Sequence, residues 1–510
     1  MIEESLREML SANGDKLFSL CRYAINVESK EQVLNRKFLG RLHLESEWME
    51  ETLDRHGAIH NFSWLPFREV IAAEKIFSSA CLDLLFLENI EPNYKLLREE
   101  SEFTKAIDRN LDIFFAILVK ISKEILHLGK KHSIDIVITD LDYGMFKEEF
   151  IMGKLKTTRK SHRGENLHNK AIYLATSFLN LSPEVHIIET LHCIKDRNIK
   201  DCIPDHINEE KLRFLKARFH NLQSTYDTYL SKTDLEKEDK DLLVLREHIS
   251  IIYHLLCSAT ELSHYYERHI LNAGHRFLKK ARLPVNKELN MEMIIGFDMY
   301  YINQYFTAAK TLCKEIIKKY AKIAEIALPI PEYRGFHVRP STLISKIVLH
   351  YGSDVTMLLG DEAYDASSPL ELFRVNEKIN SEKRKYINKL SKPLAPLDEL
   401  NKSNLEEWPK KIQLVMLDLM GSKKIILYEN NLSLEGVTPE EGETPKEFFK
   451  RLLAIFLASG KIDIHSDIKV TFRGDKRVLE DLKILADNGY GEDKYGNNII
   501  LPQELPYLRR

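Results

Sequence analysis

An apolar stripe at helical spacing constrains the first 320 residues of this chain more than any other feature. In one stretch, apolar side chains recur at positions that share one face of a helix; they are Leu111, Phe114, Phe115, Leu118 and Ile121. A second stripe comprises Leu212, Leu215, Phe219 and Leu222. We find no fixed-period repeat of the kind that builds a solenoid. The sequence therefore predicts an α-helical bundle over residues 1–320.

Glycine and proline are scarce, which supports a mostly helical chain. The 510 residues contain 20 glycines and 16 prolines, too few for the many tight turns of an all-β fold. A chain of this length normally forms several domains, each with its own core. We therefore expect the helical region to be followed by at least one further domain.

Charge and cysteine content restrict the compartment and the partners. The formal net charge is -3, so no basic field draws the protein to nucleic acid or to acidic membranes. The six cysteines are scattered, which favours a reducing compartment over a disulfide framework. The N-terminus lacks the apolar segment of a signal peptide, and the longest apolar run, Ile113–Val119, is too short to cross a bilayer. These features predict a cytoplasmic protein without nucleic-acid or membrane partners.

Two short segments in the helical region have alternative interpretations. Ile134–Ile138 is a β-like run, and the following Asp140 and Asp142 could hold a divalent cation or form a polar turn. Lys154–Arg163 is a basic loop that could take a phosphate or an acidic partner, or could simply be solvated. In both cases the structural interpretation is the more common outcome.

Two sets of histidines and their neighbours could bind metal. The first set has the donor types of a zinc site without the spacing of a zinc finger; it consists of His192, Cys193, Cys202 and His206. The second is similar to part of a di-metal bundle site but lacks its remaining carboxylates; it consists of His254, Glu261, His264 and His269. The helical flanks of the first set argue against zinc, and ordinary surface and core histidines explain the second set better, so we expect no metal or other cofactor.

From about residue 322 the pattern changes to alternating short strands and helices. We expect strands at 324–330, 355–359, 363–366 and 467–473. Helices are expected at 341–351, ending at Gly352, and after Ser368-Pro369, where serine and proline form a good start signal. A last helix, through Val478 and Leu485, should end at Gly489. The fold class is therefore α+β, with a large all-α region before it.

A long segment, residues 381–465, interrupts this second domain. It contains a possible hairpin that starts at Ile425–Tyr428 and turns at Asn430-Asn431. It also contains a capping box, Thr444-Pro445-Lys446-Glu447, which predicts the start of a helix. We therefore divide the chain into a helical region (1–320), a first part of the α+β domain (322–380), an insertion (381–465) and a second part (466–500).

The main chemical signal lies at His337, just before the helix predicted at 341–351. A neutral imidazole is a nucleophile at pH 7, and phosphohistidine transfers its phosphoryl group readily. Arg339 can bind phosphoryl oxygens, and Pro340 suits a first helical turn. The N–H groups of Ser341 and Thr342 should then point at the anion. The alternative is that His337 merely caps the helix.

The order of these elements, with His337 and Ser368 at two helix starts, resembles the HPr phosphocarrier family of the phosphoenolpyruvate-dependent sugar phosphotransferase system. Gly335-Phe336-His337-Val338-Arg339-Pro340 is similar to that family's Gly-x-His-x-Arg-Pro signature. The match continues without a gap to Ser368, where the family has its regulatory serine, and Gly489-Tyr490-Gly491-Glu492 is similar to the family's tail. The resemblance covers about 322–373 and 466–493.

The resemblance implies an open-faced βαββαβα sandwich and assigns roles to several residues. His337 is the expected phosphoryl acceptor, Arg339 its charge stabiliser and Ser368 a regulatory phosphosite. An apolar docking patch is expected to include Leu370, Leu372 and Phe373. The chain departs from the family at Arg334, at Pro369, at Glu371 and in the long insertion.

The sequence thus predicts a carrier or regulatory protein of the phosphotransferase system, without catalytic turnover of its own. A donor protein of the phosphotransferase type would phosphorylate His337, and a downstream protein could receive the group. The competing hypothesis is a helical interaction or scaffold protein whose HPr-like part transfers nothing. A metal-dependent helical enzyme is a third hypothesis.

Overall fold

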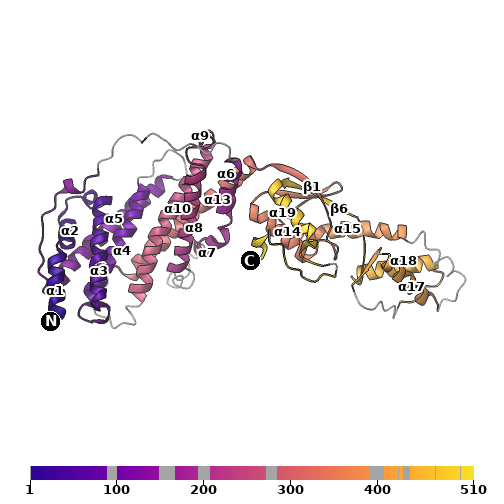
Figure 1. The fold of residues 1–510 in the computed structure, drawn as a ribbon, viewed down its shortest axis with the longest axis horizontal. Coiled ribbons are helices and arrows are strands. Elements are labelled where there is room, and N and C mark those ends of the chain that lie inside the picture. The colour runs from indigo at the N-terminus through magenta and orange to yellow at the C-terminus, as the bar shows by residue number, and fades with distance from the viewer. Residues whose placement is uncertain are drawn as a thin grey trace. The chain divides into compact units, whose positions relative to one another are not determined.

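A computed structural model describes residues 2–88, 100–148, 155, 167–192, 207–271, 284–390, 407–422, 424–428, 437–465, 467–493 and 495–509. The chain divides into two compact units, Met1–Ile316 and Ile317–Arg510 (Figure 1). The first unit is helical, and the second combines helices with two antiparallel sheets. The protein therefore belongs to the mixed α+β class with a large helical region.

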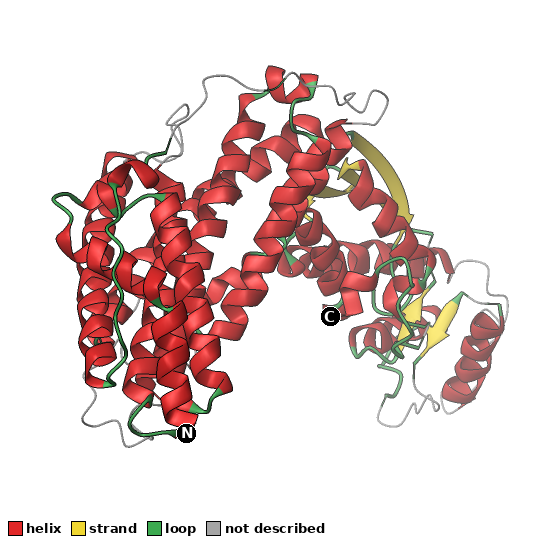
Figure 2. Cartoon of the chain, turned by 60° about the vertical axis from the view of Figure 1, so that its left-hand side comes forward, coloured by secondary structure: helices red, strands yellow, loops and turns green. Residues whose placement is uncertain are grey.

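Helices of very different lengths lie side by side in unit 1 (Figure 2). They are α1 (Ile2–Asn13), α2 (Asp15–Asn26), α3 (Arg36–Arg55), α4 (Leu65–Glu88), α5 (Glu100–Lys131), α6 (Leu167–Leu179), α7 (Ser182–His192), α8 (Glu209–Tyr229), α9 (Asp234–Glu238), α10 (Lys240–Tyr265), α12 (Lys287–Met291) and α13 (Tyr300–Tyr320). Short 3-10 helices occupy Lys30–Gln32, Ala58–His60 and Tyr143–Met145, and π-helical turns occupy Tyr266–Leu271 and Glu292–Met299.

The two predicted apolar stripes face the interior of this bundle. Leu111, Phe114, Leu118 and Ile121 are buried in α5, and the four apolar residues predicted in α8 are buried as well. Helix α4 packs against α3, α5 and α10, so it lies at the centre of the bundle. Among the described residues, one helical segment, Lys240–Leu271, is long and apolar enough to cross a membrane, and most of it is buried in the protein, as in a core helix.

The strand predicted at Ile134–Ile138 was wrong. The segment is extended, but it forms no ladder with another described strand. Its backbone instead bonds to serine side chains of the bundle: Asp135 N–H donates to Ser11 Oγ, and Thr139 N–H donates to Ser19 Oγ, each at 2.9 Å. Alternation of apolar and polar residues is typical of a strand, but it does not show whether the segment pairs with another strand. Here the segment bonds to helices instead.

A four-stranded antiparallel sheet organises unit 2. Its strands are β1 (Ile323–Pro329), β2 (Val355–Leu359), β3 (Glu362–Asp365) and β6 (Lys469–Asp475), in the order β1-β6-β2-β3. Its helices are α14 (Val338–Tyr351), α15 (Pro369–Leu390) and α19 (Lys476–Asp487). Buried residues of β2 and β6 share one core with apolar residues of these helices, so the helices cover one face of the sheet. Short 3-10 turns at Gly489–Gly491 and Pro506–Arg509 complete this part.

The insertion has an apolar core of its own. Its elements are α17 (Trp408–Gly421), β4 (Ile425–Leu427), α18 (Pro445–Ala458) and β5 (Ile462–Ile464). The predicted capping box at Thr444 and Glu447 is present and starts α18. The strand expected at 425–428 is present as β4, and it pairs with β5, beyond α18; the expected turn at Asn430 and Asn431 lies outside the described residues. We call residues 407–465 the insertion subdomain and the rest of unit 2 the sheet subdomain.

Candidate functional site

Two consecutive left-handed residues bring the chain to His337. Arg334 has φ +52° and Gly335 has φ +64°. A Cβ atom on Gly335 would lie 2.5 Å from Asn376 Oδ1, so only glycine fits there without a shift. The same Asn376 oxygen accepts a hydrogen bond from Phe336 N–H at 2.8 Å, and Phe336 is fully buried. The loop is therefore fixed immediately before the histidine.

His337 occupies the N-cap position of α14 and directs its ring toward the C-terminal part of the sheet subdomain. Its Nε2 lies 2.7 Å from Glu492 Oε2. The side chain of His337 is 21% exposed, whereas that of Glu492 is 5% exposed. Tyr333 contacts the imidazole edge to face, with ring centres 5.4 Å apart. Among the described residues, no hydrogen-bond partner lies on Nδ1.

Arg339 is the second residue of α14 and contacts the same segment, Gly491 and Glu492, as His337 does. Its Nε donates to the carbonyl of Gly491 at 3.1 Å and lies 3.9 Å from Glu492 Oε1. Within the part of the chain that the structure describes, its two Nη groups have no hydrogen-bond partner. They can therefore bind oxygens of a phosphoryl group, because an arginine fork matches that geometry.

A hairpin turn holds Glu492 in place. Ile499 N–H donates to Gly491 carbonyl at 3.1 Å, and Asp493 exchanges backbone and side-chain bonds with Asn497. The sequence resemblance marked Gly489–Glu492 as a tail without giving Glu492 a role. Glu492 lies 155 positions from His337 in the sequence, so no local pattern indicates their contact; the fold brings them together.

The helix begins earlier than predicted, and this corrects the expectation for Ser341 and Thr342. Helix α14 starts at Val338, so Ser341 N–H already donates to the carbonyl of His337 at 3.1 Å. Ser341 is fully buried, and its hydroxyl donates to Phe336 carbonyl. Thr342 uses its hydroxyl on the carbonyl of Val338. The N–H groups without an intrahelical acceptor are therefore those of Val338 and Arg339, since Pro340 has none.

The second predicted region starts α15. Ser368 Oγ accepts from Glu371 N–H at 3.3 Å, so the serine caps the helix as expected. Leu370 and Phe373 are 69% and 48% exposed and are free to meet a partner. Leu372 is fully buried in the core of the sheet subdomain, so its assignment to a docking patch was wrong. Leu372 shares the inner face of α15 with Val375 and Ile379, which are buried in the same core. The family resemblance alone did not show this.

The insertion subdomain reaches the loop before His337 without touching the histidine in the described structure. Arg334 N–H donates to Tyr428 Oη at 3.2 Å, and its Nη2 donates to the carbonyl of Gly460 at 3.0 Å. The ring of Tyr333 contacts that of Tyr428, with centres 4.6 Å apart. This explains the departure from the family at Arg334, because this side chain joins the loop to the insertion.

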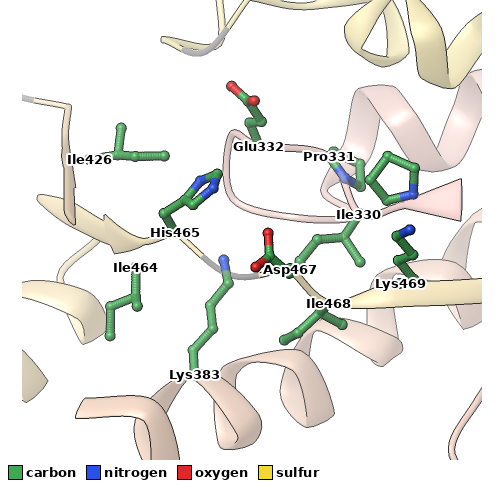
Figure 3. A pocket seen from close by; sticks show the side chains of 11 residues that line it. Ile330, Pro331, Glu332, Lys383, Ile426, Ile464, His465, Asp467, Ile468 and Lys469 are labelled. Atoms are coloured by element: carbon green, nitrogen blue, oxygen red, sulfur yellow. The ribbon is translucent and has the colours of Figure 1, made fainter. Parts of the chain in front are cut away.

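A cavity of about 140 Å³ lies between the two subdomains (Figure 3). Isoleucines from both sides form its apolar wall; they are Ile330, Ile426, Ile464 and Ile468. Its charged lining includes Glu332, Asp467, Lys383 and Lys469, together with His465. Charges of both signs are present, so the lining favours neither an anion nor a cation.

No group of three or more potential metal ligands is found in the described residues. His254, His264 and His269 each bond a different carboxylate, of Asp83, Glu209 and Glu69 respectively. Of the other candidate set, Cys193, Cys202 and His206 lie outside the described residues, as do the charged residues of the basic loop at 154–163. Asp142 accepts a hydrogen bond from Gly144 N–H, as in a polar turn.

Comparison of the chain with protein-family models, with curated proteins and with solved structures found no match.

Proposed function

We propose that the protein is a phosphoryl carrier or phosphorylation-dependent regulator of the HPr type, with His337 as the acceptor. The observation that carries this proposal is the contact between His337 Nε2 and the Glu492 carboxylate. A carboxylate only accepts hydrogen bonds, so Nε2 carries the proton and Nδ1 carries the lone pair of the neutral ring. Such a ring is oriented for nucleophilic attack through Nδ1.

The surroundings of His337 suit a phosphoryl group. Helix α14 begins at the next residue, and its first N–H groups and its dipole favour an anion. Arg339 supplies unpaired Nη groups, and Gly491 and Glu492 hold its Nε. Phosphoryl transfer depends mainly on positioning and on charge neutralisation, and this arrangement provides both.

The order of elements in the sheet subdomain also supports the proposal. Strand β1, helix α14, strands β2 and β3, helix α15, strand β6 and helix α19 follow one another as the βαββαβα resemblance implies. Both proposed phosphorylation positions, His337 and Ser368, stand at helix starts. The insertion lies between α15 and β6, and it leaves this order unchanged.

In the proposed step, the lone pair of Nδ1 attacks the phosphorus of a phosphohistidine on a donor protein. The new N–P bond forms as the donor's N–P bond breaks, and the electron pair of that bond returns to the donor imidazole. Transfer to a downstream protein reverses these roles. Leu370 and Phe373, which are exposed beside the cap of α15, are the residues that we expect to contact a donor.

Phosphorylation in vitro tests the proposal. The full chain is incubated with phosphoenolpyruvate and the general donor enzyme of a phosphotransferase system, and the label is measured after acid and after alkaline treatment. We expect label that is stable in alkali, is lost in acid and is missing from His337→Ala. His350→Ala serves as the matched control, because His350 lies at the other end of α14 and should leave labelling unchanged.

The competing function is an interaction protein with a non-transferring sheet subdomain. Absence of label on His337 with a donor that phosphorylates a standard carrier in the same tube would favour it.

A further inference from the structure

Several polar contacts join the insertion subdomain to the sheet subdomain, beside the cavity with its isoleucine wall. Each subdomain buries an apolar core of its own, and the two sets of core residues do not overlap. Helix α15 extends to the insertion, where Lys383 Nζ lies 2.7 Å from both carboxylate oxygens of Asp463. We call the contacts between the two subdomains the seam. It resembles an interface between domains, at which relative motion is common.

Arg334 makes the seam contact that is closest in sequence to His337. Its backbone and its guanidinium both bond the insertion, through Tyr428 Oη and the carbonyl of Gly460. Gly460 has φ +69°, and a Cβ atom there would lie 2.9 Å from Arg334 Nη2. Glycine at 460 therefore permits the guanidinium to approach this carbonyl.

Tyr333 links this contact to the imidazole. The guanidinium carbon of Arg334 lies 5.2 Å from the centre of the Tyr333 ring and 5.8 Å from that of Tyr428. The same Tyr333 ring also contacts the imidazole of His337. Arg334 is exposed, so its side chain can turn about the Tyr333 ring without displacing core residues.

We propose that Arg334 binds the insertion when His337 is free and binds the phosphoryl group when His337 is phosphorylated. Phosphorylation thereby loosens the docking of the insertion subdomain. This inference rests on the proposed function and adds to it a means by which the state of His337 is passed to the rest of unit 2.

The charge of the phosphoryl group determines which of the two contacts Arg334 prefers. A phosphoryl group adds about -1.5 to -2 charges next to the loop, whereas the carbonyl of Gly460 is neutral. The guanidinium of Arg334 is charged in both states, but the carbonyl offers it only a dipole, whereas the phosphoryl oxygens add direct Coulomb attraction between opposite charges. Arg334 therefore gains by exchanging the carbonyl for the phosphoryl oxygens, and water can take its place at the half-exposed Gly460.

The cavity in the seam favours such a release. Pro331 and Glu332, which precede Tyr333, line one side of it, while Ile464 and His465 of the insertion line the other (Figure 3). Because the surfaces are separated by this space, parting them sacrifices few close apolar contacts.

Hydrogen–deuterium exchange on the full chain tests the inference. Phosphoramidate phosphorylates His337 without a donor enzyme: Nδ1 attacks phosphorus, the N–P bond of the reagent breaks, and ammonia leaves with the electron pair. Phosphate on His337 is quantified separately at alkaline pH. Exchange is then compared in peptides that contain Arg334 and Tyr428, whose contact closes the seam.

We expect phosphorylation to speed exchange at Arg334 roughly fivefold to tenfold, a change that corresponds to about 1 to 1.4 kcal/mol. In Arg334→Gln, exchange should be fast before phosphorylation and should change little after it. Arg473→Gln, an exposed arginine on β6, is the matched control and should respond like the wild type. His337→Ala treated with phosphoramidate should show no change.

Unchanged exchange in protein that carries phosphate on His337 would overturn this inference and leave the proposed function intact. A similar response in Arg334→Gln and in the wild type would also overturn it. Failure of His337 to accept phosphate from phosphoramidate and from a competent donor enzyme would instead overturn the proposed function, and this inference with it.

Discussion

At the scale of single residues, the contact between His337 and Glu492 decides which imidazole nitrogen is free to react. Glu492 is 5% exposed, so its carboxylate has few competing water contacts and is held by the hairpin that follows it. An arrangement of this kind fixes both the tautomer and the ring orientation. We therefore regard Glu492 as a positioning residue for the proposed transfer.

Glu492→Gln tests this role. The amide keeps the size of the side chain but loses the charge, and it can donate as well as accept. We expect the rate of His337 phosphorylation to fall by about tenfold to a hundredfold, since a hydrogen bond to a charged group contributes about 1.5–3 kcal/mol. The 15N chemical shifts of the imidazole should show a mixture of tautomers. Glu504→Gln, an exposed residue of the same C-terminal segment, should alter neither quantity, and an unchanged rate and tautomer in Glu492→Gln would contradict the assignment.

We expect a second residue, Glu74, to make the stability of the helical unit sensitive to pH. It is fully buried in α4, where Ser122 Oγ donates to its Oε1 at 2.9 Å and its Oε2 has no hydrogen-bond partner among the described residues. Burial raises the pKa of Glu74 from 4.5 to about 8. Between these two values the folded chain holds a proton that the unfolded chain has released. The contribution to stability is therefore complete below 4.5 and is lost as the pH rises to about 8.

We expect the wild-type protein to lose thermal stability between about pH 5 and about pH 8, and Glu74→Gln to lose less over the same interval. The slope due to Glu74 is on the order of 1.4 kcal/mol per pH unit at most. Glutamine stays neutral at every pH, so the difference between the two melting-temperature profiles isolates this residue. Parallel profiles would show that Glu74 does not titrate in this range. Glu69 does not account for such a loss: burial favours a higher pKa, but His269 and Arg68 outweigh it and lower the pKa of Glu69, so its effect on stability has the opposite sign.

At the scale of elements, local signals predicted most of unit 2 correctly. The span of β2, the cap at Ser368 and the capping box at Thr444 follow from side-chain alternation and from hydrogen bonds between neighbours in the chain. The start of α14 was placed three residues too late because His337 is not a usual capping residue. Its side chain bonds Glu492 and leaves the cap without a side-chain bond. Long-range contacts of this kind leave no trace in the local pattern.

The capping box of α18 supports a prediction about this element alone. Thr444 Oγ1 accepts from Glu447 N–H, and the carboxylate of Glu447 accepts from Thr444 N–H. Thr444→Ala should reduce the stability of the helix by about 0.5–2 kcal/mol, because Glu447 N–H loses its acceptor and the Glu447 carboxylate loses the hydroxyl that donates to it. Faster hydrogen exchange in the first turns of α18 is the expected signature. Thr444→Ser keeps the hydroxyl and should behave like the wild type; equal exchange in Thr444→Ala and Thr444→Ser would rule out the capping contribution.

At the scale of the whole molecule, the apolar stripes predicted the helical unit, and the alternation of short strands and helices after residue 322 predicted the α+β unit. They did not predict that β4 pairs with β5 across α18, or that Arg334 bonds the insertion. Both features depend on residues that are distant in sequence and come together only after folding. The sequence also did not predict that Lys383 is buried, because a lysine in an amphipathic helix is expected to face solvent.

Lys383 and Asp463 form a buried ion pair between the two subdomains. Their side chains are 3% and 5% exposed, so neither charge is solvated well. Asp463 also accepts from Ile464 N–H, and Tyr428 Oη lies 3.2 Å from it. A buried pair of this kind contributes little relative to an apolar pair, but removal of one partner leaves the other charge buried and alone.

We therefore expect Lys383→Met to weaken the association of α15 with β5 by about 3–5 kcal/mol. The double variant Lys383→Met/Asp463→Asn should lose less than the single variant, because no unpaired charge remains. Native-state hydrogen exchange of the β4 and β5 amides measures both changes. Lys385→Met removes an exposed lysine of the same helix, paired with Glu382, and should cost less than about 1 kcal/mol. If Lys383→Met and Lys385→Met behave alike, the pair is solvated in solution, and the seam is then held mainly by Arg334 and Tyr428.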